Sequence, residues 1–118
     1  KKILVVEDNE QNLYLMQYML ETSGYAVVVV TNGAEAIVSA AQEKPDLILM
    51  DIQLPDIDGL EATRRIRASE ANAKIPIVAV TSFAMTGDRE KALEAGCNSY
   101  IEKPIDPEAF LSSIARYL

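Results

Sequence analysis

Histidine is absent from the 118-residue sequence, and cysteine occurs only once, as Cys97. A single cysteine excludes an internal disulfide, so nothing points to an oxidising compartment and we expect a cytoplasmic protein. Basic residues are in the minority, with 11 Lys and Arg against 18 Asp and Glu and a net charge of −7. Because phosphate backbones are bound by clustered Lys and Arg, this balance excludes direct nucleic-acid binding.

Long apolar runs and signal-peptide patterns are also missing, so we expect neither a membrane span nor membrane binding. The residues that are present, 49% hydrophobic and 25% charged, are typical of a soluble globular protein. A chain of this length has room for one core, and we predict a single domain over residues 1–118. Whether that domain stands alone or is fused to others is left open.

Short runs rich in β-branched residues alternate with segments of helical periodicity along the whole chain. The predicted strands span residues 3–6, 26–30, 47–50, 77–80 and 99–101. Most of these runs are apolar at consecutive positions, which is typical of parallel strands covered by helices on both faces. Right-handed crossovers favour the strand order 2-1-3-4-5, so we predict a doubly wound, flavodoxin-like α/β fold.

The predicted helices have recognisable starts and stops. Asn9 is expected to cap the first helix and Gly24 to end it, while Asn32 precedes the second. The second ends before Pro45, the third and fourth cover about residues 59–68 and 88–95, and the last begins near Pro107.

Polar side chains follow the predicted strands at their carboxyl ends. Glu7 and Asp8 come after the first strand, Asp51 after the third, Thr81 after the fourth and Lys103 after the fifth. In an open parallel sheet these ends meet at one edge, where ligands bind between the first and third strands. We therefore expect one site at this edge.

The residue types at this edge indicate phosphoryl-transfer chemistry with a metal ion. Three carboxylates in one place repel one another, so one is protonated or a cation lies among them. Oxygen ligands without histidine favour a hard ion such as Mg²⁺. Lys103 would place a positive charge beside an incoming phosphoryl group, and the Thr81 hydroxyl would donate a hydrogen bond to it. Asp51, at the centre, is the predicted nucleophile.

Four motifs in this order resemble the CheY-like receiver domains of two-component response regulators. They are VVEDN with the acidic pair, LILMDIQLPDIDG around Asp51, AVTS with Thr81 and Ser82, and YIEKP with Tyr100 and Lys103. The resemblance covers essentially the whole chain. MDIQLP and AVTSFAM are most similar to stand-alone DivK-like receivers, and the receivers of hybrid histidine kinases are also similar.

The resemblance implies a phosphoacceptor switch in phosphorelay signalling. Asp51 would take a phosphoryl group from a histidine kinase or a histidine phosphotransfer protein, and the domain would then change its affinity for a downstream protein. Asp8, Asp51 and the Gln53 backbone carbonyl would ligate Mg²⁺, with Glu7 holding a metal-bound water. A monomer or a weak dimer is expected.

The resemblance also implies a switch made of Thr81 and Tyr100. Thr81 would move toward the phosphoryl group and Tyr100 would follow inward. Gln53 and Phe83 would occupy the two variable positions of the family that set the lifetime of the phosphorylated state. The peptide bond before Pro104 would be cis.

Two further residues after Asp51 are assigned a geometric role from their own chemistry. Pro55 fixes its backbone angle, and Gly59 permits a close approach of the backbone, so both shape the loop.

Rival interpretations stay open at this stage. An aspartyl-phosphate phosphatase would need a second Asp two residues after Asp51 as general acid, and Gln53 stands there. A nucleotide or flavin binder would need a glycine-rich first turn, where this chain has EDNEQN. A receiver-like domain that only binds partners would not need Asp8, Asp51, Thr81 and Lys103, so their presence argues against it. We expect self-catalysed phosphotransfer and slow autodephosphorylation, not a multiple-turnover enzyme.

Other distinctive residues have plain structural interpretations. Arg64, Arg65 and Arg67 are expected on the solvated face of the third helix, offset by Glu61 and Glu70. Cys97 fits a tight helix-to-strand connection as a small apolar residue. Tyr100 is compatible with core packing as well as with a switch.

Overall fold

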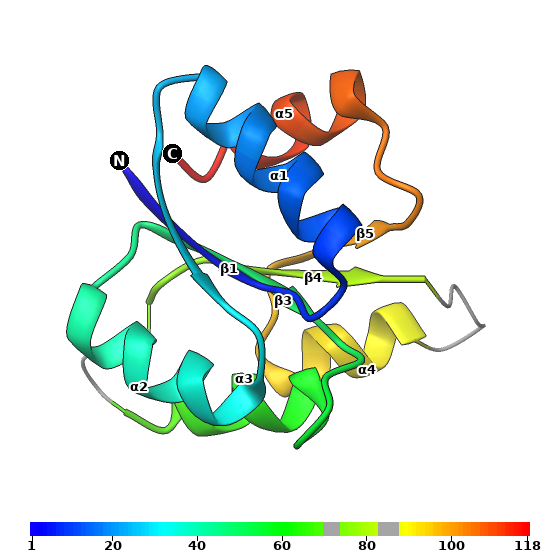
Figure 1. Cartoon of the computed structure of the whole chain (residues 1–118). Helices are drawn as coiled ribbons and strands as arrows, with labels where there is room; N and C mark the ends of the chain where they lie inside the picture. Colours follow the sequence, from blue (N-terminus) through cyan, green and yellow to red (C-terminus); the bar gives the residue numbers. More distant parts are fainter. Residues whose placement is uncertain (70–73, 83–87) are drawn as a thin grey trace.

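Within residues 1–69, 74–82 and 88–118, which the structure describes, five parallel strands form the centre of the molecule (Figure 1). The structure is a computed structural model. The strands are β1 (Lys2–Val6), β2 (Ala26–Val30), β3 (Leu47–Asp51), β4 (Ile77–Thr81) and β5 (Ser99–Glu102). The helices are α1 (Glu10–Thr22), α2 (Gly33–Glu43), α3 (Gly59–Arg67), α4 (Asp88–Ala95) and α5 (Pro107–Ala115).

Hydrogen-bonded neighbours in the sheet run in the order β2-β1-β3-β4-β5, and each pair is parallel. This confirms the predicted doubly wound fold, including its strand order. The middle strands β3 and β4 are buried along their whole length, whereas the edge strands β2 and β5 are partly exposed. The consecutive apolar residues of the middle strands therefore follow from burial on both faces.

Different helices cover the two faces of the sheet. In Figure 1, α1 and α5 lie on one face, while α2, α3 and α4 lie on the other. Because successive strand residues point to opposite faces, each strand contributes to both cores. Leu4, Ile48 and Ala79 belong to the core under α2, α3 and α4, and their neighbours Ile3, Leu49 and Val78 to the core under α1 and α5.

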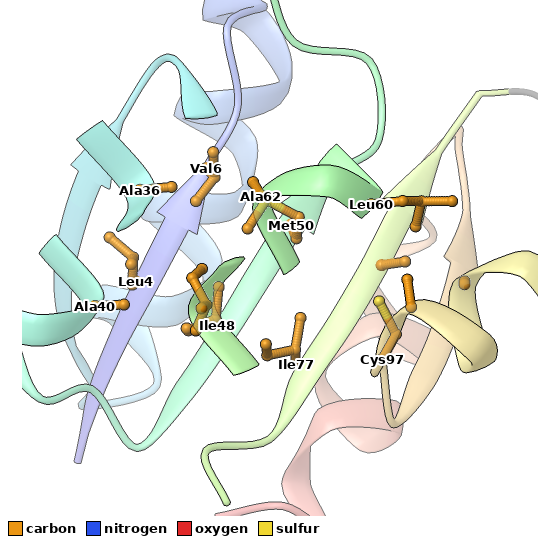
Figure 2. Close-up of a cluster of buried hydrophobic side chains, with 14 of the residues drawn as sticks. Leu4, Val6, Ala36, Ala40, Ile48, Met50, Leu60, Ala62, Ile77 and Cys97 are labelled. Atoms are coloured by element: carbon orange, nitrogen blue, oxygen red, sulfur yellow. The ribbon is translucent and has the colours of Figure 1, made fainter. Parts of the chain in front are cut away.

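In the core under α2, α3 and α4, small side chains let α2 and α3 approach the sheet closely. Figure 2 shows Ala36 and Ala40 of α2 and Ala62 of α3 beside the β1 and β3 residues of this core. All three alanines are fully buried. A larger side chain at any of them would push a helix outward or force its neighbours from their preferred rotamers.

The predicted helix ends are confirmed. The Asn9 side chain accepts a hydrogen bond from the Asn12 amide, and Asn32 does the same for Glu35. Gly24 follows the first helix in the left-handed region at a φ of 94°, which glycine adopts without steric cost. Each strand begins or ends within one residue of its predicted bounds.

One prediction about α3 is wrong. Arg64 and Arg65 are exposed and pair with Glu61, as expected, but Arg67 is only partly exposed and donates hydrogen bonds to backbone and side-chain oxygens. Its guanidinium donates to the Gly96 carbonyl at 2.9 Å, to the Asn98 side chain at 2.7 Å and to the Ile75 carbonyl. Arg67 therefore joins α3 to the loops that enter β4 and β5. Glu70 lies outside the described residues.

No helix among the described residues is both long and apolar enough to cross a bilayer.

Cys97 is 5% exposed, and its burial raises the pKa of the thiol above its ordinary value. This burial fits the predicted packing role.

Candidate metal centre at the carboxyl edge of the sheet

Backbone hydrogen bonds extend the sheet by one residue beyond several strands and so fix the polar side chains that follow them. The Glu7 amide donates to the Val30 carbonyl at 3.1 Å, and the Lys103 amide to the Thr81 carbonyl at 2.7 Å. Asp51 is the last residue of β3 and pairs with Val80 in register. Each of these side chains thus starts from a rigid backbone position at the same edge of the sheet.

Three carboxylates meet at this edge. Glu7, Asp8 and Asp51 each place a carboxylate oxygen within 4.8 Å of the others. Glu7 is fully buried and Asp51 is 3% exposed, whereas Asp8 lies at the surface. A cleft of about 390 Å³ opens between them and is lined by these three residues together with Asn9, Asn12, Gln53, Ser82 and Lys103.

Lys103 bridges the two buried carboxylates. Its ammonium lies 2.6 Å from Glu7 Oε1 and 3.3 Å from Asp51 Oδ2. The Lys103 side chain is 9% exposed, so little water screens these pairs. The peptide bond between Lys103 and Pro104 is cis, as the resemblance implied.

Burial makes Glu7 an unusual carboxyl group. Burial, together with a hydrogen bond to Asp51, raises the pKa of Glu7 from 4.5 to about 7, although Lys103 acts in the opposite direction. Apart from the Lys103 ion pair, Glu7 Oε1 has no hydrogen-bond partner among the described residues. One lysine therefore does not compensate the desolvation of the carboxylate cluster.

The donor set fits a hard divalent cation. All the candidate ligands are oxygens, Glu7 lines the cleft, and its buried Oε1 has only the Lys103 ammonium as a partner among the described residues. Mg²⁺ prefers a few carboxylates and keeps several waters, which this cleft would accommodate. The Gln53 amide donates to Asp51 Oδ1 at 3.0 Å, and Gln53 also lines the cleft.

The structure does not bring every predicted site residue to this cleft. Thr81 is buried and lines an adjoining cavity of about 580 Å³ on the side of α3 and α4, which shares Gln53 with the carboxylate cleft, while its neighbour Ser82 lines the cleft itself. Successive side chains of a strand point to opposite faces of the sheet, which explains why Thr81 and Ser82 line different cavities. Thr81 points to the same face as Ala79, and Tyr100, which pairs with Ala79, packs against that core as well.

Tyr100 is partly buried, and this burial raises the pKa of its phenol above the ordinary value. It lies away from the carboxylate cleft, in a groove that it shares with Pro104 and residues of α5. The same alternation was available in the sequence and would have separated Thr81 and Tyr100 from Glu7 and Asp51. Phe83 lies outside the described residues.

The loop after Asp51 depends on the absence of a side chain at Gly59. A Cβ atom there would lie 2.1 Å from the Asp51 carbonyl oxygen, so no other residue fits without moving the β3 end. Pro55 is exposed on the same loop.

Comparison with known proteins gives the same family from sequence and from structure. The response regulator receiver domain profile matches residues 3–115. The polar-differentiation response regulator DivK of Brucella anthropi is 46% identical over 118 residues, which is all of this chain and 96% of that protein. DivK of Brucella ovis is also 46% identical over the same span.

Solved receiver structures superpose closely. The receiver domain of the sensor histidine kinase PA1611 of Pseudomonas aeruginosa, with magnesium coordinated in its active-site cleft, has a TM-score of 0.92 at 43% identity, covering 99% of this chain and 96% of that one. The BeF₃-activated receiver domain of Klebsiella pneumoniae RstA has a TM-score of 0.91 at 34% identity, covering 99% and 97%.

Proposed function

This chain belongs to the response regulator receiver domain family, and from that membership we propose that Asp51 is its phosphoacceptor. The family acts in two-component signal transduction, so the chain is a signalling phosphoacceptor with Mg²⁺ as cofactor and a histidine kinase as partner. We propose further that residues 1–118 are one receiver domain, a monomer or a weak dimer.

The observation that carries this proposal is the ion-pair geometry at the sheet edge. Lys103 contacts Asp51 and Glu7 at once, and carboxylate oxygens of Glu7, Asp8 and Asp51 lie within 4.8 Å of one another. Phosphoryl transfer requires a nucleophile that lies close both to a fixed positive charge and to carboxylates able to hold a metal ion.

In the proposed step, an oxygen of the Asp51 carboxylate attacks the phosphorus of a partner phosphohistidine. The O–P bond forms as the N–P bond breaks, and the histidine nitrogen leaves with the electron pair. Asp8, Asp51 and the Gln53 carbonyl would hold Mg²⁺, with Glu7 acting through a bound water. When bound, Mg²⁺ offsets negative charge on the phosphoryl oxygens, and Lys103 contributes a second positive charge.

The proposed signal leaves the site through Thr81 and Tyr100. Both side chains lie on the α2, α3 and α4 face, and their strands are neighbours in the sheet. Movement of the Thr81 hydroxyl toward the phosphoryl group would vacate space on that face and let Tyr100 follow inward, which changes the surface offered to a downstream protein. Attack of water on the aspartyl phosphate, at a rate set in part by Gln53 and Phe83, would restore Asp51.

The proposal predicts that Asp51→Asn abolishes phosphorylation. The wild-type chain and the variant are incubated with acetyl phosphate or beryllofluoride, with and without Mg²⁺, and followed by mass and by backbone amide spectra. The wild type should gain one phosphoryl group only with Mg²⁺, with amide shifts extending from Asp51 to Thr81 and Tyr100. The variant should gain none.

Stoichiometric phosphorylation of Asp51→Asn would contradict the assignment of the phosphoacceptor. A wild-type chain that responds to neither reagent would favour a domain that only binds partners. A thermal unfolding curve of the variant serves as the control for its fold.

A further inference from the structure

The loop of residues 52–58 borders the carboxylate cleft through Gln53, and hydrogen bonds fasten its start to β3 and its end to its own first residue. At its start the Gln53 amide donates to Asp51 Oδ1 at 3.0 Å. At its end the Gly59 amide donates to the Ile52 carbonyl at 2.8 Å. The middle of the loop needs a separate anchor, because neither of these bonds restrains it.

Asp56 supplies that anchor by reaching a helix distant in the sequence. Its Oδ1 accepts from the Gly33 amide at 2.8 Å, and its Oδ2 accepts from the Ala34 amide at 2.9 Å. These amides open α2, where the first N–H groups of a helix have no partner within it. The same two bonds lower the pKa of Asp56 below its ordinary value, so the carboxylate is charged at neutral pH.

The helix does not depend on Asp56 for its own start. Asn32 already caps α2 from within, accepting from the Glu35 amide at 2.8 Å. The two caps differ in one respect: the Asn32 bond is local to α2, whereas the Asp56 bonds join α2 to the loop beside the cleft. This difference supplies a matched control.

Side-chain packing reinforces the junction. A Cβ atom on Gly33 would lie 2.3 Å from Cγ1 of Ile57, so the loop and the helix are in contact with no room between them. Ile57 is partly buried against the core under α2 and α3. The loop is thus held by two hydrogen bonds and an apolar contact at one place.

We propose that Asp56 is a positioning residue for the metal site: by tying the loop to the amino end of α2, it holds the Gln53 backbone at the cleft before the ion arrives. This inference rests on the proposed function, in which the Gln53 carbonyl ligates Mg²⁺. A loop fixed in advance loses less conformational entropy on binding, and partners of this supporting kind commonly contribute tenfold or more to metal affinity.

The test compares three variants with the wild-type chain by calorimetric titration with Mg²⁺. Asp56→Ala should weaken Mg²⁺ binding by about tenfold. Asp56→Asn keeps one acceptor oxygen and should show a smaller loss. Asn32→Ala removes a cap from the same helix without touching the loop, and its Mg²⁺ affinity should match the wild type.

Two additional measurements separate positioning from simple loss of stability. In the metal-free chain, amide hydrogen exchange at Gly33, Ala34 and residues 52–58 should rise in Asp56→Ala, while that of the loop should stay unchanged in Asn32→Ala. At saturating Mg²⁺, the rate of phosphorylation of Asp56→Ala by acetyl phosphate should return to the wild-type rate, because the defect lies in affinity.

Wild-type Mg²⁺ affinity in Asp56→Ala would overturn the inference, and so would an equal loss in Asn32→Ala. A phosphorylation rate that stays low at saturating Mg²⁺ would also overturn it, since Asp56 would then act on the chemical step or on the folded population. If the wild-type chain itself binds no Mg²⁺, the proposed function fails, and this inference fails with it.

Discussion

Burial places Glu7 under electrostatic strain, because its charged form is disfavoured in the folded chain. Its carboxyl group is fully buried and has Lys103 as its ion-pair partner, with Asp51 close enough to share a hydrogen bond. Protonation of Glu7 relieves this strain in the metal-free chain, and a cation in the cleft would relieve it in another way.

This strain predicts a pH dependence of stability. The pKa of Glu7 is about 7 in the folded chain against 4.5 as the ordinary value, so between these pH values the folded state binds more protons. Without metal, the contribution of Glu7 to the free energy of unfolding should therefore be largest at low pH. It should fall by up to about 3 kcal/mol as the pH rises through 7. Urea unfolding at several pH values in the presence of a chelator measures this.

Glu7→Gln should flatten that dependence, because glutamine does not titrate. Glu94→Gln, at an exposed position of α4, provides the control and should keep the wild-type profile. An unchanged slope in Glu7→Gln would mean that other groups set the pH dependence.

At the scale of elements, the last turn of α3 connects parts of the chain that are far apart in sequence. Arg67 bonds to the Gly96 carbonyl and to Asn98, and Asn98 in turn accepts from the Ile77 amide at 2.9 Å. Burial lowers the pKa of the Arg67 guanidinium from its ordinary value, although it stays charged. The arginine therefore fixes α3 against the starts of β4 and β5.

Arg67→Ala should lower the free energy of unfolding by about 2 to 3 kcal/mol, because it leaves carbonyl oxygens without their charged donor. Arg64→Ala removes an exposed pair with Glu61 on the same helix and should change stability by less than about 1 kcal/mol. Denaturant midpoints at constant slope measure both. Equal losses in the two variants would show that the Arg67 bonds add nothing beyond a surface ion pair.

At the scale of the whole molecule, the carboxylate cluster links metal binding to the stability of the fold. The chain has a net charge of −7, and the two buried carboxylates of the described residues, Glu7 and Asp51, meet at one edge of the sheet. A cation bound there stabilises only the folded state, since the cluster exists only when β1 and β3 are paired.

Removal of Mg²⁺ should therefore lower the melting temperature. At a concentration one hundred times its dissociation constant, Mg²⁺ adds about 2.7 kcal/mol, which corresponds to roughly 10 °C for a domain of this size. Scanning calorimetry with Mg²⁺, and again after addition of chelator, measures the shift. NaCl at equal ionic strength is the control, and an equal shift with NaCl would indicate general screening in place of a specific site.

The sequence by itself determined the order of strands and helices and the edge at which the site lies. These depend on local signals: consecutive apolar residues in buried strands, caps such as Asn9, and the rule that carboxyl ends of parallel strands share an edge. It also placed Glu7, Asp8, Asp51 and Lys103 together, because each lies at the carboxyl end of its strand or within two residues beyond it.

Only the tertiary structure decided the partners of residues distant in the sequence. The hydrogen bonds of Asp56 to Gly33, and those of Arg67 to the loops before β4 and β5, join residues distant in the sequence. Such contacts produce no local sequence pattern, and the sequence therefore predicts a solvated Arg67. The burial of Glu7 and its distance from Lys103 likewise arise when separate strands pack and exclude water. Periodicity reports which face a residue occupies, whereas hydrogen-bond partners and pKa shifts depend on which elements meet in space.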